Sequence, residues 1–291
     1  MSIPRISATC LAMMLLLASV YAQNSDSPGL HPCGFTIIQF PGAQNTTATG
    51  INNAGTIVGS YVDNNFNAHG FILADNQFQS IDFPSGLGGT GLISINNRGQ
   101  ILGSVDGTSA NPNPQSFILE NGTFTLLNFP DTPSNAITAF NDHNEFTGTD
   151  GSGPLQGFVI SGGQRTNLPD FNGSKFFPAG LNDRGVVTGN VDQQNYAALL
   201  RFGQFTTIQA PGASATSASG INSLNEVVGT VTLSDSSQEA YFYSNGSFTL
   251  FTFPDAFFTG AVAVNDHRQI LGTNSVGLFD FQSWVTQLCT Q

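Results

Sequence analysis

The chain has 291 residues, and its 19 acidic residues outnumber 7 basic ones to give a net charge of −12. Nucleic acids and anionic lipids are bound through Lys and Arg side chains that displace counterions, so this acidic composition argues against both partners. Disorder is also disfavoured, because 25 Phe residues supply enough apolar side chain for a sizeable core.

The first 22 residues have the pattern of a secretory signal peptide. Arg5 gives a positive start, an apolar run extends from Ile6 to Val20, and small residues lead to a cleavage site after Ala22. This run is too short to span a membrane, and no later segment reaches the ~18 apolar residues that a membrane helix needs. We therefore expect a secreted, soluble protein without membrane insertion, comprising a leader over 23–34 and one domain over 35–291.

Two cysteines remain after the signal peptide is removed with Cys10. Cys33 precedes the first repeat described below, and Cys289 lies two residues from the C-terminus. An even pair in an exported chain predicts a disulfide, which here would join the two ends of the fold. Two unpaired thiols are the alternative.

The chain contains six copies of one unit. An Asn in a similar setting, as in GINNAGTIVGS, recurs at spacings of 40 to 45 residues, at Asn52, Asn96, Asn141, Asn182, Asn222 and Asn265. Such a period is the signature of a repeat architecture. In the first copy, four strand-like pieces can be recognised, namely Thr47–Asn52, Thr56–Val62, His69–Leu73 and Phe78–Phe83.

These pieces predict an all-β fold, a six-bladed β-propeller of four-stranded blades. The fourth piece alternates polar and apolar residues, as in Gln79, Ile81 and Phe83, and a Pro commonly follows it. An extra fourth piece, Phe35–Phe40, begins the domain, and Ser283–Leu288 ends it. We expect these terminal strands to close the ring. A two-layer or irregular β array is the alternative.

The turns carry their own signals. The turn after the repeated Asn is typical of a type I turn followed by a left-handed residue, where Gly or Asn fits at little cost; Arg268 departs from this pattern and predicts strain or a different turn. These left-handed positions are Gly55, Gly99, Asn144, Gly185, Asn225 and Arg268. Tight hairpins are predicted between the third and fourth pieces at Asp75-Asn76, Asn121-Gly122, Gly162-Gly163 and Asn245-Gly246.

One glycine recurs inside the second strand of every copy. Glycine weakens a strand unless another group must come close, so the repetition favours a packing role over ligand binding. These structural glycines are Gly59, Gly103, Gly148, Gly189, Gly229 and Gly272.

The repeats resemble the HAF family of probable extracellular repeat proteins, which is named for a His-(Ala/Gly)-Phe motif. The motif is present as His69-Gly70-Phe71, between INNAGTIVGSYVD and FILADNQFQSIDFPSG, and the resemblance extends from about Phe35 to the end of the chain. It implies bacterial export and a repeat fold, and no settled activity. The equivalent triplets read QSF (115–117), QGF (156–158), AAL (197–199), EAY (239–241) and VGL (276–278).

Candidate ligand-binding residues follow the repeated glycine or lie in loops. Carboxylates at Asp63, Asp106, Asp150 and Asp192 would form a ring on one face, able to hold a polyhydroxylated ligand or Ca²⁺, although each loop offers only one carboxylate and turn formation explains Asp equally well. Aromatic side chains that could stack on sugars are Tyr61, Phe257 and Phe258, with packing between blades as the alternative. No cofactor other than possible Ca²⁺ is implied.

No catalytic or metal-binding pattern is present. The histidines lack the spacing of metal ligands, and Ser-rich segments lack the G-x-S-x-G turn. The leading hypothesis is therefore a non-enzymatic, secreted module that binds an extracellular glycan or protein. The alternatives are a polysaccharide hydrolase or lyase with paired carboxylates in the channel, and a structural envelope or matrix component.

Overall fold

The computed structural model describes residues 29–84, 88–106, 114–129, 137–151, 155–277 and 280–290. The regular structure of these residues consists entirely of β-strands, which are labelled β1 to β24 in chain order. The predicted signal peptide lies outside the described residues. No helix in the described ranges is long and apolar enough to cross a membrane.

Four sheets have four antiparallel strands each, in sequential order. The first sheet comprises β2 (Asn45–Ile51), β3 (Ile57–Val62), β4 (Ala68–Ala74) and β5 (Gln77–Ile81). The second comprises β6 (Thr90–Ile95), β7 (Ile101–Val105), β8 (Gln115–Glu120) and β9 (Thr123–Leu126). The third comprises β10 (Ile137–Phe140), β11 (Phe146–Asp150), β12 (Gln156–Ser161) and β13 (Gln164–Asn167). The fourth comprises β14 (Phe176–Leu181), β15 (Val187–Val191), β16 (Ala197–Arg201) and β17 (Gln204–Ile208). The four pieces expected in the first repeat are therefore found within a few residues.

The remaining strands form one eight-stranded sheet, so the prediction of six separate blades was wrong at this point. The sheet joins two four-strand groups because the first residues of β20 and β22, Gln238 and Phe258, pair in parallel. One group comprises β18 (Ala215–Ile221), β19 (Val227–Thr232), β20 (Gln238–Ser244) and β21 (Ser247–Phe251). The other comprises β22 (Phe258–Val264), β23 (Gln269–Gly277), β24 (Asp280–Thr290) and β1 (Leu30–Ile38).

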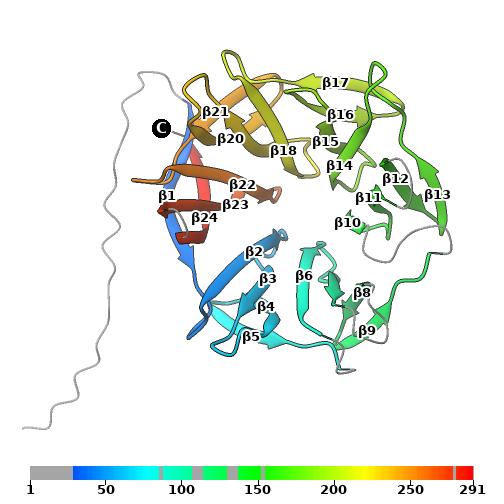
Figure 1. Cartoon of the computed structure of the whole chain (residues 1–291), viewed down its shortest axis with the longest axis vertical. Coiled ribbons are helices and arrows are strands. Elements are labelled where there is room, and N and C mark those ends of the chain that lie inside the picture. The colour runs from blue at the N-terminus through cyan, green and yellow to red at the C-terminus, as the bar shows by residue number, and fades with distance from the viewer. Residues whose placement is uncertain are drawn as a thin grey trace, which may run out of the picture.

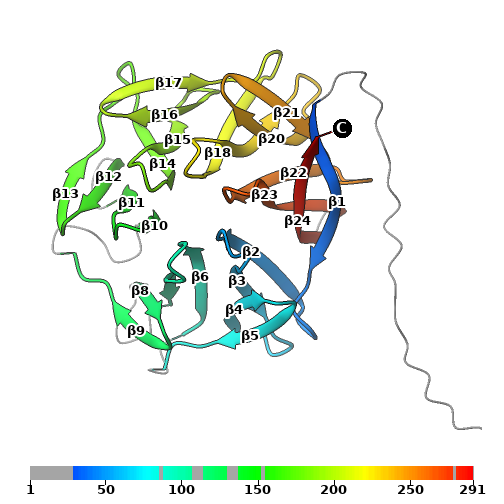
Figure 2. The same ribbon diagram turned by 180° about the vertical axis from the view of Figure 1, so that it is seen from behind.

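The sheets stand radially around a central axis (Figures 1 and 2). The first strand of each repeat lies nearest the axis, and the fourth lies at the periphery. Successive strands are antiparallel, so the turns after the first and third strands all lie at one end of the ring, which we call the turn face. The loops after the second strand and the connections between repeats lie at the other end, the loop face.

The two ends of the chain meet in the last repeat. β1 pairs antiparallel with β24, as the sequence predicted for the terminal strands. The predicted disulfide is confirmed, because Cys33 and Cys289 are bonded, with their Cα atoms 5.7 Å apart. β1 starts at Leu30 rather than at Phe35, because His31 already pairs with Cys289 in the ladder.

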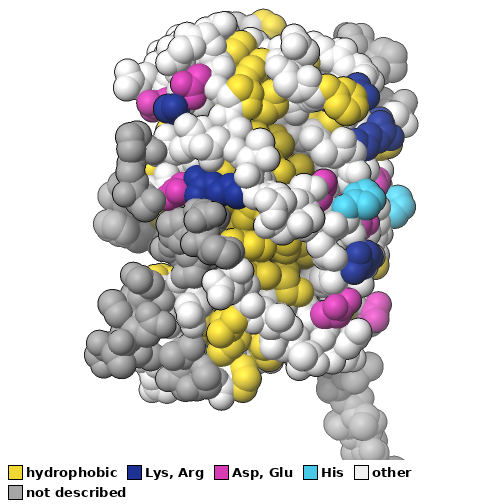
Figure 3. Space-filling view, turned by 90° about the vertical axis from the view of Figure 1, so that its right-hand side faces the viewer, with side chains coloured by type: hydrophobic (Ala, Val, Ile, Leu, Met, Phe, Trp, Pro, Cys, Tyr) yellow, Lys and Arg dark blue, Asp and Glu magenta, His cyan; other side chains and the backbone are white. Residues whose placement is uncertain are grey.

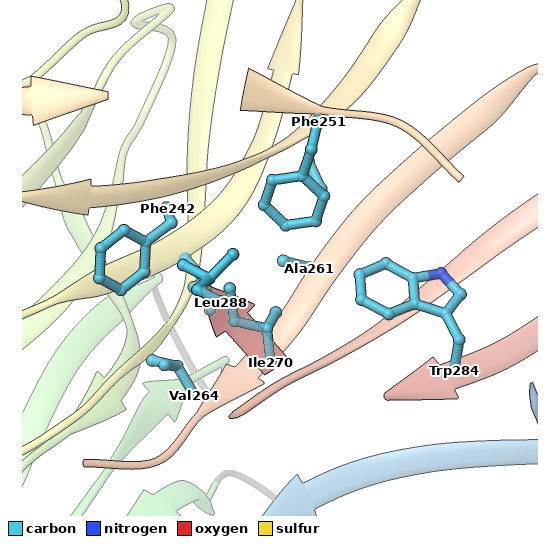
Figure 4. Packing of buried hydrophobic residues seen from close by; sticks show 9 residues of the cluster. Phe242, Phe251, Ala261, Val264, Ile270, Trp284 and Leu288 are labelled. Carbon is cyan, nitrogen blue, oxygen red and sulfur yellow. The ribbon is translucent and has the colours of Figure 1, made fainter. Parts of the chain in front are cut away.

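Hydrophobic side chains of successive repeats pack against each other around the ring. In one cluster, Val228, Phe242 and Phe251 of the fifth repeat contact Ile270 and Trp284 of the sixth (Figure 4). Another cluster joins the first repeat to the last, through Ala48, Ile51, Ile57 and Phe71 on one side and Ile38 and Leu271 on the other. The core is therefore divided into layers between neighbouring repeats, and one of these layers joins the first repeat to the last.

The repeated glycines allow close packing within each sheet. Each is paired with a residue of the third strand, and a Cβ on Gly103 would lie 2.3 Å from Cζ of Phe117 and 2.9 Å from the carbonyl oxygen of Gly91. The pairs are Gly59–Phe71, Gly103–Phe117, Gly148–Phe158, Gly189–Ala198, Gly229–Tyr241 and Gly272–Trp284. Backbone approach and a large ring together leave no room for a side chain.

This register also corrects the alignment of the HAF triplets. The position of Phe71 is occupied by Ala198 in the fourth repeat and by Trp284 in the sixth, and not by Leu199 and Leu278. In the fourth repeat, the ring of Phe176 from the first strand comes close to Gly189 instead. In the fourth repeat, the aromatic ring beside the glycine thus comes from the first strand rather than the third, so the position equivalent to Phe71 could not be recognised from the sequence.

Substitution of Gly103 by Ala should lower the free energy of unfolding by about 2–3 kcal/mol, because the added methyl group overlaps a fully buried ring. Urea unfolding of the variant and of Gly91→Ala provides the measurement and its control. Gly91 lies on the neighbouring strand, where a Cβ would come no closer than 3.7 Å to the Ser104 Oγ. Equal losses in the two variants would contradict the packing role.

Candidate functional site

The six repeated asparagines form a closed ring of hydrogen bonds at the turn face. Each side-chain N–H donates to the main-chain carbonyl of the next repeat's Asn, and the last one returns to the first, with N···O distances of 2.8–3.3 Å. Each Oδ1 accepts two N–H groups of its own turn, as Asn222 does from Leu224 and Glu226. The Asn that identified the repeats in the sequence is therefore buried, and its side-chain amide links neighbouring repeats.

All six turns have the predicted left-handed residue. Gly55, Gly99 and Gly185 have φ of 70° to 79°, and Arg268 has φ 59° in the same turn. Arg268 therefore carries strain rather than a different turn. Its side chain binds the buried Glu226 of the preceding repeat, with Nε and Nη2 at 2.9 and 2.8 Å from Oε1.

The residues that follow the repeated asparagines form a second ring of hydrogen bonds beside the first. The Asp142 N–H donates to the Asp183 carboxylate at 2.8 Å, and the Ser223 hydroxyl donates to the other oxygen of Asp183 at 2.9 Å. The ring contains Asn53, Asn97, Asp142, Asp183, Ser223 and Asp266. Sequence reasoning missed its three carboxylates, although a small polar residue at this position in all six copies was a visible signal.

A cavity of about 360 Å³ lies on the axis beside these rings. Its lining comes from the inner strands of all six repeats and includes three carboxylates but no Lys, Arg or His. No group of three or more His, Cys, Asp or Glu side chains in the described ranges is arranged to hold a metal ion. The carboxylates act instead as acceptors for main-chain N–H groups of neighbouring repeats.

The predicted carboxylates Asp63, Asp106, Asp150 and Asp192 lie at the other end, on the loop face, and none of them lines the axial cavity. Their observed contacts lie within single repeats. Asp150 forms an ion pair with Arg165 at 2.7 Å, and the N–H groups of Asp106 and Asp192 donate to carbonyls of Gly89 and Lys175. These contacts place the residues in the scaffold of their own loops.

Asp63 organises the loop between β3 and β4. Its Oδ1 accepts the N–H groups of Asn65 and Asn67, both at 2.8 Å, and these bonds, that of Asn67 first, hold its pKa at about 2. The loop presents Phe66, whose side chain is 79% exposed. Asp63 therefore stays ionised in this loop at any pH well above 2.

Tyr61 and the histidine of the HAF motif stack beside this loop. The Tyr61 ring lies 3.7 Å from the Phe40 ring and 5.0 Å from that of His69. His69 Nδ1 lies 2.6 Å from Asp82 Oδ1, and Nε2 lies 3.5 Å from Asp63 Oδ2. Burial alone would lower the pKa of His69, but the hydrogen bonds and charges of both carboxylates outweigh it and raise this pKa. Tyr61 and Asp63 therefore belong to one partly buried cluster, in which His69 stacks on Tyr61 and contacts the Asp63 carboxylate.

Phe257 and Phe258 lie on the loop face and line an apolar pocket of about 470 Å³. Phe258, Ser275 and Phe281 are cross-strand neighbours on β22, β23 and β24, so their side chains stand on the same face of the sheet. Gln238 and Gly277 complete the lining. Phe257 is 79% exposed and Phe281 is 54% exposed. The sequence identified two of the three phenylalanines, and Phe281 joins them only through strand pairing.

Comparison with solved structures identifies the architecture. Virginiamycin B lyase from Staphylococcus aureus aligns with a TM-score of 0.52 and 12% identity, over 87% of this chain and 98% of that one. The β-propeller domain of the Trilobed protease from Pyrococcus furiosus aligns with a TM-score of 0.53 and 9% identity, over 84% and 83%. The protein is a β-propeller. Aleuria aurantia lectin aligns with a TM-score of 0.51 and 10% identity, over 84% of this chain and 94% of the lectin.

These likenesses establish the fold alone, because every identity is low and the similar propellers differ in activity. No family model and no curated protein matches the chain. Membership of the HAF family thus stays a prediction from the motif residues.

Proposed function

We propose that this propeller is a secreted, non-enzymatic module that binds a neutral glycan in the pocket formed by Phe257, Phe258 and Phe281. The observation that carries the proposal is the exposure of two of these rings, because large apolar side chains in water mark binding sites when they surround a pocket. The C–H faces of sugar rings would pack on the phenyl faces.

The polar groups and charges around the pocket favour a neutral sugar. Gln238 and Ser275 provide hydrogen-bonding groups at its wall, as a hydroxylated ligand requires. Asp255 lies two residues before Phe257 in the chain, and no Lys or Arg lines the pocket. A carboxylate close to the site would repel an anionic polysaccharide.

The propeller fold suits this role. The structure of the Aleuria lectin contains a bound Fucα1-6GlcNAc, so this architecture can carry a sugar site. Its low identity to the present chain transfers no residue roles. The argument for this chain rests on its own three phenylalanines.

Substitution of Phe257 or Phe281 by Ala should weaken glycan binding by about tenfold or more, because each change removes an aromatic face worth more than 1 kcal/mol. Mature protein is first applied to an array of neutral glycans, and the best binder is then titrated by calorimetry. Phe202→Asn, which replaces an exposed phenyl group on the turn face of the propeller, provides the control. Binding that survives both Ala variants, or a protein that binds no glycan, would refute the proposal.

The alternative of a hydrolase or lyase in the channel has weaker support. Asp183 and Asp266 both use their two carboxylate oxygens as acceptors within the second ring. These bonds tie the carboxylates to the scaffold and leave them poorly suited to transfer protons. The role of a structural matrix component is tested by the same array.

The proposal also includes export of the protein and the number of its blades. A disulfide persists in oxidising compartments, which supports a signal peptide over residues 1–22 and a bacterial extracellular location. We also propose that the eight-stranded sheet acts as two blades, because only the pair Gln238–Phe258 joins its halves, while the hydrogen-bond ring has one Asn from each of six repeats. HAF membership would fit both features.

A further inference from the structure

One hairpin at the turn face has an unexpected residue. The loop between β16 and β17 consists of Phe202 and Gly203, with φ of 49° and 76°. The other hairpins at this position have Asp75-Asn76, Asn121-Gly122, Gly162-Gly163 and Asn245-Gly246, all with positive φ. Asn, Asp and Gly tolerate this left-handed conformation, whereas a bulky side chain is strained in it. Phe202 therefore reduces the stability of its own turn.

Phe202 is also the most exposed large hydrophobic side chain of the described chain, at 86%. The Arg201 guanidinium lies over its ring, 5.1 Å from the centroid. Arg201 is exposed, and no ion pair of it is found in the described ranges. Strain, exposure and an adjacent cation together are typical of a residue that binds a partner, because aromatic side chains and Arg are enriched at protein interfaces.

The opposite end of the same molecule has a complementary surface. The pocket of Phe257, Phe258 and Phe281 is apolar and has room for a phenyl ring. Asp255, an exposed residue two positions before Phe257 in the chain, carries the charge opposite to Arg201. In the side view, the His side chains lie along one edge of the ring, where Lys and Arg side chains alternate with Asp and Glu side chains (Figure 3).

We propose that Phe202 of one copy inserts into the Phe257–Phe281 pocket of a second copy, with Arg201 facing Asp255. The contact joins the turn face of one ring to the loop face of the next. Such a heterologous contact leaves both outer ends free, so it produces chains of rings rather than a closed dimer. Self-assembly of this kind is a property beyond the proposed glycan binding, and the two uses compete for one pocket.

The test is sedimentation analysis of the mature, disulfide-bonded protein over a concentration series. The native protein should show open-ended association with a dissociation constant on the order of 0.1 mM, as expected for one small contact. Phe202→Asn should weaken association by about tenfold or more and should raise the melting temperature by about 2–4 °C, because Asn fits the turn. Phe66→Asn is the matched control, since Phe66 is also left-handed, with φ 65°, and exposed, but lies on the loop face without an adjacent Arg.

The charges provide a second, independent readout. Arg201→Glu should weaken association, and added salt should reduce the difference between this variant and the native protein. A native protein that stays monomeric throughout the series, or equal association of the native and Phe202→Asn proteins, overturns the proposal. At protein concentrations too low for association, Phe202→Asn should bind glycan as the native protein does, so loss of self-association and loss of glycan binding are distinguished by one variant.

Discussion

Replacing Cys33 and Cys289 together by Ser should lower the free energy of unfolding by about 3–5 kcal/mol and the melting temperature by about 10 °C. The disulfide closes a loop with a sequence separation of 256, and a loop of this length loses much unfolded-state entropy when it is cross-linked. The effect should be large here because the bond holds the two strands whose pairing closes the ring.

The native structure should nevertheless form without the disulfide. β1 and β24 remain paired from Leu30–Thr290 to Ile38–Ser283, and Phe35 packs against Trp284 with ring centroids 5.1 Å apart. Trp284 is the chain's single Trp and is fully buried in the same repeat, so its fluorescence reports directly on this region.

Urea and thermal unfolding followed by Trp284 fluorescence should therefore show a native spectrum for the double variant and an earlier transition. A reducing agent supplies the control, since it should destabilise the native protein and leave the double variant unchanged. Identical transitions for the two proteins under oxidising conditions would show that strand pairing alone holds the ends.

Local signals predicted much of the fold. The spacing of the repeated Asn gave the repeat unit, and a Gly or Asn three residues later marked a turn that is indeed left-handed, as at Gly55 with φ 78°. These features are local to one repeat, because the residue type at a turn position directly restricts the backbone φ angle there. The terminal strands and the disulfide were predictable for a different reason, because a ring of repeats must join its first and last members.

Contacts between repeats were harder to predict from the sequence. Nothing in the sequence around Asn182 indicates that its amide donates to a carbonyl of Asn222, or that Asp183 accepts the N–H of Asp142. The same limit hid the pairing of Gln238 with Phe258, which merges two sheets. It also hid the recruitment of Phe281 to the pocket of Phe257. Such partners are fixed by the rotation from one repeat to the next, which no local pattern encodes.

Arg268 is the clearest case in which a residue that differs from the repeat pattern is explained by a contact with another repeat. Its left-handed φ of 59° suits Gly, which the equivalent turns have at Gly55, Gly99 and Gly185. Replacement of Arg268 by Gly should nevertheless lower the free energy of unfolding by about 2–3 kcal/mol. The substitution leaves the carboxylate of Glu226 without its cation, and that side chain is only 4% exposed.

The sign of this effect should reverse once Glu226 is replaced by Gln. The second and sixth repeats have Gln100 and Gln269 at this position, and their Oε1 atoms accept the N–H of the repeated Asn at 2.8 and 2.7 Å, as Glu226 does at 2.7 Å. In the Glu226→Gln background no buried charge needs Arg268, so Arg268→Gly should only relieve the left-handed strain. It should then stabilise the protein by about 1 kcal/mol.

A double-mutant cycle by urea unfolding measures both steps. The two values of the Arg268→Gly effect should differ by about 3–4 kcal/mol and have opposite signs, which is a coupling far above that of an exposed ion pair. Equal effects in the two backgrounds would mean that the Arg268 side chain stabilises the turn by itself. A reversal would show that the sixth repeat accepts a strained turn because the fifth has buried a carboxylate beside it.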